Sequence, residues 1–380
     1  MAKKKKFRAE FKKNRSERTR QTDWTRKFKQ DAIEEGDLVG QERVSGKGEL
    51  TRRRTITGIE REEGQDTGID VQLEVDEAAC LRGRVLSVYG LASIVQTFDG
   101  TLYRCVTRRL LKTLAIDQRH SLTAGDEVLF RPIPNSDQRE GVVERIEPRH
   151  GVISRATKGK QHVMVANVDQ ALLVSSAAEP TLKPNLIDRL LVTAEKTRIR
   201  PIVCINKVDL VDPASLEPLV GVYSQMGYQV LLLSVRAGVG IERLRRVLSG
   251  RASVVVGQSG VGKSSLLNSV EPALSLPVAS VSVESLKGRH TTTAARLLPL
   301  SFGGYVVDTP GVRQFQLWDV IREEVGGFFR DFRPYVNHCR FPNCTHTHEA
   351  DCAIKDAVAD GHLDDRRYDS YCRLFAGEFD

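Results

Sequence analysis

A glycine-rich segment in the second half of the chain has the residue types and spacing of a phosphate-binding loop. It follows the β-branched run 252–256 and reads Gly257, Gln258, Ser259, Gly260, Val261, Gly262, Lys263, Ser264 and Ser265. Glycines let backbone N–H groups approach phosphate oxygens, and the N-terminus of the following helix attracts negative charge. We predict that Lys263 reaches the β- and γ-phosphates of a nucleotide and that Ser264 binds Mg²⁺. The alternative is a strand-to-helix turn that binds nothing.

The tetrad Asn206-Lys207-Val208-Asp209 follows the apolar run 201–205, which predicts a buried strand. Ligands of doubly wound sheets bind at the carboxyl ends of such strands. The Asp209 carboxylate can accept hydrogen bonds from both N1–H and the N2 amine of guanine. Adenine cannot donate this pair of hydrogen bonds. Asn206 would anchor the loop and the base, and the Lys207 stem would cover the ring. Ser234 begins a loop that could give guanine O6 a backbone donor. Alone, the tetrad also occurs by chance in charged loops.

A third pattern, Asp308-Thr309-Pro310-Gly311, follows the predicted strand 305–307. Asp308 would orient Mg²⁺ or its water, and the Gly311 amide would sense a γ-phosphate. One of the threonines Thr291, Thr292 and Thr293 would complete the Mg²⁺ shell, and Thr292 joins Lys263 among the candidate catalytic residues. Because three patterns agree, we predict an α/β domain that binds GTP with Mg²⁺.

The guanine-reading tetrad precedes the phosphate-binding loop, whereas familiar small GTPases have the reverse order. We therefore predict a circularly permuted GTPase domain, because a site needs its groups together in space rather than in chain order. In this order the segment Asp308–Gly311 leads directly into the C-terminal region. A movement that depends on the γ-phosphate could then pull on that region.

Three of the seven cysteines crowd together near the C-terminus, at Cys339, Cys344 and Cys352. In a reducing compartment this crowding indicates a metal before disulfides. Three thiolates and one imidazole match a closed, four-coordinate structural zinc site. His346 lies within the cluster, with His338 and His348 nearby as alternatives. Free cysteines without a metal are the other interpretation.

Composition indicates a soluble, cytoplasmic protein of two or three domains. The 380 residues exceed one ordinary core, the apolar runs are much shorter than a membrane span, and no apolar stretch follows the N-terminal lysines as in a signal peptide. Residues 1–30 carry 13 Lys/Arg and 3 Asp/Glu, so the basicity belongs to a tail. This tail could neutralise nucleic-acid phosphates, or be a solvated disordered extension or a nuclear or organellar address. No coiled-coil or pairing segment is evident, so a monomer is expected.

We predict four segments in the chain. They are a basic tail and flexible, poorly ordered linker over 1–80, an oligonucleotide-binding (OB-fold) β-barrel over 81–150, the permuted GTPase domain over 151–318, and a zinc-binding helical domain over 319–380. The barrel is predicted by five short alternating runs separated by turns, at 83–88, 93–97, 102–106, 127–130 and 141–146.

Aromatic and basic residues of the predicted barrel suit single-stranded nucleic acid. Bases could stack on Tyr89, Phe98 or Tyr103. The backbone could be bound by Arg82, Arg84, Arg104, Arg108 and Arg109. Such barrels also serve as spacers or protein docks, so the pattern alone leaves these alternatives open.

Taken together, these features resemble the ribosome small-subunit-dependent GTPases of the RsgA (YjeQ) family over roughly residues 81–375. The resemblance rests on the barrel, the permuted motifs, the cysteine cluster, and the segments Glu147-Pro148-Arg149, Ile153-Ser154-Arg155, Asn167-Val168-Asp169-Gln170 and Gly288-Arg289-His290-Thr291-Thr292-Thr293. It implies a late-acting assembly factor that binds the immature small ribosomal subunit and its rRNA near the decoding region. GTP hydrolysis to GDP would be coupled to release of the factor itself or of another maturation factor.

The resemblance also implies roles for single residues. It selects His346 as the fourth zinc ligand, although Glu349-Ala350-Asp351 stands where family members tend to have Glu-Pro-Gly. Val312, which follows Gly311, cannot polarise water, in agreement with the family's slow hydrolysis and its stimulation by the subunit. The resemblance puts His290 forward as the catalytic substitute, against a histidine that only packs within the segment.

Two other functions fit the same sequence. The first is an RNA-binding protein that uses GTP only as a conformational switch, and the second is a GTPase that acts on another RNA or a membrane partner. Near the cysteines, several basic and aromatic residues could contact rRNA or be plain helix surface. They are Arg340, Lys355, Arg366, Arg367, Arg373, Tyr368 and Tyr371.

Overall fold

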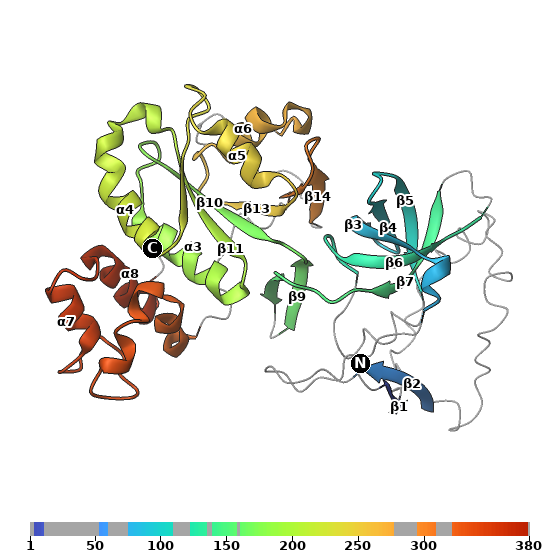
Figure 1. Ribbon diagram of the computed structural model, residues 1–380, viewed down its shortest axis with the longest axis horizontal. Coiled ribbons are helices and arrows are strands. Elements are labelled where there is room, and N and C mark those ends of the chain that lie inside the picture. Colours follow the sequence, from blue (N-terminus) through green and yellow to red (C-terminus); the bar gives the residue numbers. More distant parts are fainter. Residues whose placement is uncertain are drawn as a thin grey trace, which may run out of the picture. The chain divides into compact units, whose positions relative to one another are not determined.

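The computed structural model describes residues 4–10, 53–59, 75–108, 122–134, 139–157, 160–276, 295–308 and 321–378 (Figure 1). The chain divides into two compact units, residues 1–76 and 77–380. In the first unit, β1 (Lys4–Glu10) and β2 (Arg53–Ile59) pair antiparallel, with Lys4 opposite Ile59 and Glu10 opposite Arg53. Neither strand is expected from the sequence, because β1 is lysine-rich, which is atypical of strands, and β2 lies in the segment predicted to be a flexible linker.

Five strands of the second unit close into a barrel in the order β3-β4-β5-β7-β6. They are β3 (Leu81–Tyr89), β4 (Ala92–Thr97), β5 (Leu102–Thr107), β6 (Glu127–Pro132) and β7 (Glu140–Ile146), after the short 3₁₀ helix η2 (Glu77–Ala79). Val85, Val95, Phe130 and Val143 fill its interior. β5 and β7 are parallel and the other pairs antiparallel. All five predicted strands are present, and the predicted OB-like barrel is confirmed.

A mixed sheet in the order β12-β11-β10-β13-β15-β14 forms the α/β domain. Its strands are β10 (Gln170–Ser176), β11 (Arg200–Asn206), β12 (Gln229–Leu232), β13 (Ala252–Val256), β14 (Arg296–Pro299) and β15 (Tyr305–Asp308). All neighbours are parallel except the edge pair β14 and β15. The chain runs from β10 outward to β12 and then returns to β13 beside β10. Ligands of such folds bind where the strand order reverses, which here is between β10 and β13.

Helices cover both faces of this sheet (Figure 1). One face carries α3 (Pro184–Thr197) and α4 (Glu217–Gln225), and the other carries α5 (Ile241–Leu248) and α6 (Lys263–Val270). Along β10, Leu173 packs in the first layer and Leu172 in the second. Burial on both faces explains why the strands read as continuous apolar runs. Short 3₁₀ helices lie in the connections at η3 (Val208–Leu210), η4 (Pro213–Leu216) and η5 (Pro272–Leu274).

The C-terminal region packs against helix α3. Its elements are η7 (Arg322–Phe328), η8 (Arg330–Phe332), η9 (Val336–His338), α7 (Ala353–Ala359) and α8 (Asp365–Ala376). Its core contains Phe329, Phe332 and Tyr371, and also Val192 from α3. Helix α3 is therefore shared, because one side packs on the sheet and the other enters the C-terminal core.

A polar joint connects the barrel to the α/β domain, next to the hairpin of β8 (Ile153–Thr157) and β9 (Lys160–Val165). Arg149 donates from Nε and Nη2 to the two oxygens of buried Asp126, at 2.6 and 2.7 Å. Asn167 donates from Nδ2 to the Gly125 carbonyl at 2.9 Å, and its Oδ1 accepts the His150 N–H at 2.9 Å. Two of the segments that carry the family resemblance, 147–149 and 167–170, thus have a structural role.

Substitution of Gly125 tests this joint. Gly125 has φ of +90°, and an added Cβ would lie 1.9 Å from the Ala166 carbonyl oxygen. We expect Gly125→Ala to lower the free energy of unfolding by more than about 2 kcal/mol, since it adds a clash to the strain of a left-handed backbone. Gly100→Ala is the matched control, because Gly100 has φ of +85° with open space around it and should cost about 1 kcal/mol. Urea denaturation of both variants provides the comparison, and equal losses would exclude a tight joint.

Candidate functional site

The phosphate-binding loop lies at the carboxyl end of β13, against the neighbouring strands. Gly257 has φ of +150°, and a Cβ there would lie 2.0 Å from the Val174 carbonyl oxygen of β10. Gly262 has φ of +92°, and a Cβ would lie 2.4 Å from Asn206 Nδ2. Both glycines are required because the loop passes directly over β10 and β11. The loop residues Gln258, Ser259, Gly260 and Val261 lead into α6, whose first turn contains Ser264 and Ser265.

The guanine-reading tetrad is connected to this loop by one hydrogen bond. Asn206 ends β11, and its Nδ2 donates to the Val261 carbonyl at 2.8 Å. Its Oδ1 is buried and has no hydrogen-bond partner among the described residues. Asn206 therefore anchors the loop and keeps one acceptor available. The sheet order puts β11 two strands from β13, which corresponds to about 10 Å.

Ser234 reaches the tetrad through its side chain. Ser234 is buried, and its Oγ donates to Asp209 Oδ1 at 2.5 Å while it accepts the Ala237 N–H at 3.0 Å. The exposed Asp209 carboxylate is thus oriented by a neighbour that we expected to act only through its loop backbone. A serine directly after the apolar run 230–233 is the signal that marks this role in the sequence.

The two lysines are held by carbonyl oxygens. Lys263 donates from Nζ to Gly257 O at 2.9 Å and to Gln258 O at 2.5 Å, so the ammonium lies over the loop. Lys207 Nζ donates to the Glu179 carbonyl in the loop after β10, which also accepts from Ser176 Oγ at 2.9 Å. Both ammonium groups therefore lie at the same edge of the sheet.

Asp308 is the last residue of β15, which is the strand next to β13. The carboxyl ends of β11, β13 and β15 thus bring Asp209, Lys263 and Asp308 to one edge of the sheet. Other predicted residues lie outside the described part of the chain. They are Arg109, Arg289, His290, Thr291, Thr292, Thr293, Gly311 and Val312.

Cys339, Cys344, His346 and Cys352 converge on one point. Their ligand atoms all lie within 4.8 Å of one another, and His346 Nδ1 is 3.5 Å from Cys339 Sγ and 3.4 Å from Cys352 Sγ. A tetrahedral ion with bonds of about 2.3 Å to sulfur and 2.0 Å to nitrogen separates its ligands by roughly 3.5–3.8 Å. Burial lowers the pKa of His346, which favours the neutral imidazole that binds metals. The cluster fits one closed, four-coordinate cation, whereas His338 and His348 are not part of it.

The turn before Cys352 explains the departure from the family pattern. Asp351 has φ of +55°, the left-handed region that favours glycine. Its carboxylate accepts from Arg340 Nη1 at 2.6 Å, and its carbonyl accepts the Arg340 N–H at 3.2 Å. Glu349 accepts the Thr345 and Thr347 N–H groups at 2.7 and 3.1 Å. The turn is therefore formed with an aspartate in the position of the glycine.

The barrel residues considered for nucleic acid have separate positions. Phe98 is 86% exposed in the turn between β4 and β5, so it is available for stacking. Tyr103 is half-buried and packs on Phe130 with ring centroids 5.0 Å apart. Arg84 and Arg108 are ion-paired with Glu127 and Glu144, at 2.7 and 2.9 Å. Arg82 and Arg104 are exposed.

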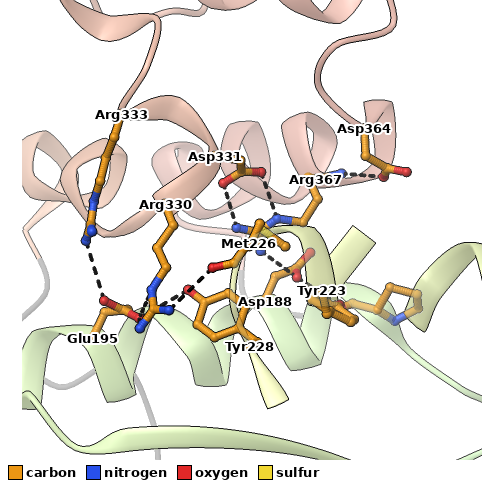
Figure 2. Close-up of polar contacts among 11 residues, drawn as sticks. Asp188, Glu195, Tyr223, Met226, Tyr228, Arg330, Asp331, Arg333, Asp364 and Arg367 are labelled. Atoms are coloured by element: carbon orange, nitrogen blue, oxygen red, sulfur yellow. Dashed lines mark hydrogen bonds and ion pairs between the residues drawn. The ribbon is translucent and has the colours of Figure 1, made fainter. Parts of the chain in front are cut away.

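Two C-terminal residues considered for RNA contact or plain surface, Arg367 and Tyr371, are buried instead. Tyr371 is buried, and Tyr368 donates from its hydroxyl to the His346 carbonyl at 2.7 Å. Arg367 is 3% exposed and donates to Asp188 of α3 at 2.6 Å and to both oxygens of Asp331 at 3.0 and 3.1 Å (Figure 2). An arginine on an amphipathic helix is predicted to lie at the surface when its buried partner is distant in the chain. The sequence therefore did not reveal the burial of Arg367.

A second ion pair extends this contact along α3. Glu195 accepts from Arg330 at 2.6 Å and from the Tyr228 hydroxyl at 3.2 Å, with Arg333 at 3.5 Å (Figure 2). Burial raises the pKa of the Asp188 carboxyl, and the charge of Arg367 opposes that rise. The hydroxyl of Tyr223 in α4 also donates to Asp188, at 2.9 Å. Charged groups thus connect the C-terminal region to α3, and Tyr223 of α4 shares one of the α3 carboxylates.

Comparison with known proteins identifies the family. The family model described as RsgA GTPase matches residues 146–318. The Small ribosomal subunit biogenesis GTPase RsgA of Sodalis glossinidius is 41% identical over 303 residues, which cover 77% of this chain and 84% of that protein. The chain belongs to the RsgA family. The resemblance inferred from the motifs is therefore confirmed.

Other relatives agree with this assignment to the RsgA family. The RsgA protein of Yersinia pseudotuberculosis is 39% identical, over 77% of this chain and 83% of the relative. The crystal structure of YjeQ from Thermotoga maritima has a TM-score of 0.65 at 34% identity, and it covers 79% of this chain and 98% of YjeQ. YloQ, described as a circularly permuted GTPase, has a TM-score of 0.62 at 28% identity, over 81% of this chain and 98% of YloQ. The permuted RsgA fold is thus confirmed. Among the described helices, none is long and apolar enough to cross a membrane.

Loss of the Arg367 charge should separate the C-terminal region from α3. Arg367→Met leaves the carboxylate of Asp188 buried without its cation, so we expect the free energy of unfolding to fall by about 3–5 kcal/mol. Arg373→Met is the control on the same helix, because Arg373 is half exposed and forms a solvent-accessible ion pair with Asp369. The control should lose no more than about 0.5 kcal/mol. Chemical denaturation of both proteins measures the difference, and similar losses would contradict the buried contact.

Proposed function

We propose that this protein is a GTPase that binds the small ribosomal subunit and its rRNA. In this proposal, hydrolysis of GTP to GDP is coupled to late maturation of the subunit and to release of assembly factors. The observation that carries the proposal is the meeting of a guanine-reading tetrad, a phosphate-binding loop and Asp308 at one edge of the sheet. The names of the relatives, small ribosomal subunit biogenesis GTPases, support the choice of partner.

The residues at this edge divide the work of binding. Asp209, oriented by Ser234, would select guanine, and Asn206 would keep the base next to the loop. Backbone N–H groups of 257–264 and Lys263 would hold the phosphates, while Ser264 and Asp308 would hold the magnesium ion. Bound Mg²⁺ would neutralise charge on the β- and γ-phosphates. His290 would orient the attacking water, one of the threonines Thr291, Thr292 and Thr293 would complete the magnesium shell, and the Gly311 amide would sense the γ-phosphate.

Three further assignments belong to this proposal. The domain boundaries would be 81–150, 151–318 and 319–380, after the tail and linker of residues 1–80. The metal of the cysteine cluster would be a single structural zinc ion. The protein would act as a monomer in the cytoplasm.

Turnover assays test the proposed function. We expect GTP hydrolysis to rise strongly when purified small ribosomal subunits are added to the wild-type protein. Lys263→Ala should reduce turnover at least about 100-fold, because it removes a charge that faces the transferred phosphoryl group. His290→Ala should keep GTP binding but lose the stimulation. GTP binding without turnover, even with subunits, would favour the conformational-switch alternative, and turnover without stimulation would favour another partner.

Asp209→Asn tests the guanine-reading role. An asparagine amide facing the N2 amine of guanine sets donor against donor, whereas xanthine has an oxygen at that position. We expect GTP affinity to fall roughly 100-fold and xanthosine triphosphate affinity to rise. Asp212→Asn is the control, because Asp212 lies on the same segment and its side chain caps η4 through the Ala214 N–H. Unchanged selectivity in Asp209→Asn would contradict this assignment.

Zinc binding should depend on pH in a defined direction. Burial raises the pKa of the Cys344 thiol to about 12 in the metal-free cluster, and a metal must displace that proton. We therefore expect zinc affinity to rise with pH and bound zinc to be released on acidification. Metal analysis of the purified protein should give one zinc per chain, and Cys344→Ala should lower occupancy. The exposed His348→Ala is the control, and equal loss of metal in both variants would contradict the ligand set.

A further inference from the structure

Strands β14 and β15 form a hairpin between two parts of the proposed nucleotide site. β15 ends on Asp308, and the register sets Arg296 of β14 directly opposite Asp308. Thr293, the last of the three candidate threonines, precedes Arg296 by three positions in the sequence. Any shift of this hairpin therefore moves Asp308, because strand register couples the two ends.

The barrel packs on the same hairpin through apolar side chains. Leu86 of β3 is buried in one cluster with Ala295, Leu297 and Val307, and Ile94 of β4 packs against that cluster. Leu297 and Val307 are opposite each other in the hairpin register. The outer wall of the barrel is thus part of the core that supports the hairpin.

Aromatic and polar contacts reinforce this packing. The Arg296 guanidinium lies 5.2 Å from the centroid of the Tyr89 ring of the barrel. The Tyr305 ring lies 5.2 Å from the guanidinium of Arg84, and the Tyr305 hydroxyl donates to Gln96 Oε1 at 3.1 Å. Side chains of β3 and β4 therefore contact both strands of the hairpin.

Arg296 is held in an unusual way. Its Nε is buried and has no hydrogen-bond partner within the described residues. Arg84, in contrast, is ion-paired with Glu127 at 2.7 Å. Contact with an aromatic face is attractive but weak compared with a buried ion pair, so the Tyr89–Arg296 contact can be exchanged for another at little cost.

We propose that the β14–β15 hairpin couples the nucleotide state to the docking of the barrel. This inference rests on the proposed function, because it needs Asp308 to respond to the γ-phosphate. A change at Asp308 shifts Arg296 and Tyr305, and these two residues carry the shift to Tyr89, Gln96 and Arg84. The polar joint at Asp126 and Arg149 keeps the barrel attached while this contact changes.

Coupling of this kind is reciprocal. If GTP in place of GDP changes barrel docking by some factor, then loosening the barrel must change the ratio of GTP to GDP affinity by the same factor. Couplings between sites are typically roughly 5- to 150-fold. The proposal therefore predicts an effect on nucleotide preference from residues that do not touch nucleotide.

The test uses the full chain with Tyr89→Ala combined with Gln96→Ala. We expect the ratio of GTP to GDP affinity, measured with fluorescent nucleotides, to change at least about 5-fold from wild type. We also expect amide exchange of residues 83–97 to differ between GTP and GDP in the wild type, and this difference to disappear in the variant. Phe98→Ala is the matched control, because Phe98 is exposed on the same barrel and should leave both readouts unchanged.

Tyr305→Phe controls for a folding defect, because it removes only the hydroxyl that donates to Gln96. It should shift the ratio of GTP to GDP affinity in the same direction as the double variant. An unchanged ratio and unchanged exchange in both variants would overturn the coupling while leaving GTP hydrolysis intact. Absence of GTP binding in the wild type would instead overturn the proposed function, and the coupling with it.

Discussion

Parallel strands end at one edge of their sheet, and the candidate site depends on this constraint. β11, β13 and β15 bring the guanine-reading tetrad, the phosphate-binding loop and Asp308 to the same edge, although the chain visits them in an unusual order. The hydrogen bond from Asn206 to Val261 ties the first two together. Circular permutation changes where the chain is cut but not which ends of the strands meet. The permuted order is therefore compatible with an ordinary nucleotide site.

Permutation does change the connection that leaves β15. In this chain the segment after Asp308 leads to the C-terminal region, which is fastened to α3 by Val192 and by the ion pairs of Asp188 and Glu195. The C-terminal region is thus anchored on the helical layer beside the sheet. A movement of Asp308 that displaced the C-terminal region would have to break a buried ion pair, which is costly. The barrel contacts the hairpin that ends on Asp308. A change from GTP to GDP would therefore reach the barrel more directly than the C-terminal region.

Local patterns predicted most of the elements that carry chemistry. The five barrel strands and the strands β11, β13 and β15 follow from apolar runs and turn residues. Other elements were not predicted from the sequence, for identifiable reasons. β1 is lysine-rich, β14 spans only Arg296–Pro299, and the C-terminal 3₁₀ helices lack a repeating apolar face. Their positions depend on the elements they pack against rather than on their own sequence.

The sequence by itself determined the kinds of groups present: a glycine-rich loop before a helix, an Asn-Lys-x-Asp tetrad, an Asp-x-x-Gly segment, and three cysteines with a histidine. Such patterns are readable because their chemistry requires particular residue types at short, fixed spacings. Tertiary structure alone decided which distant side chains meet. Ser234 orients Asp209, Arg367 is buried on Asp188, and Tyr89 lies against Arg296, over separations of 25, 179 and 207 positions. No local periodicity records such pairs, because each exists only after the sheet, the barrel and the shared helix have packed.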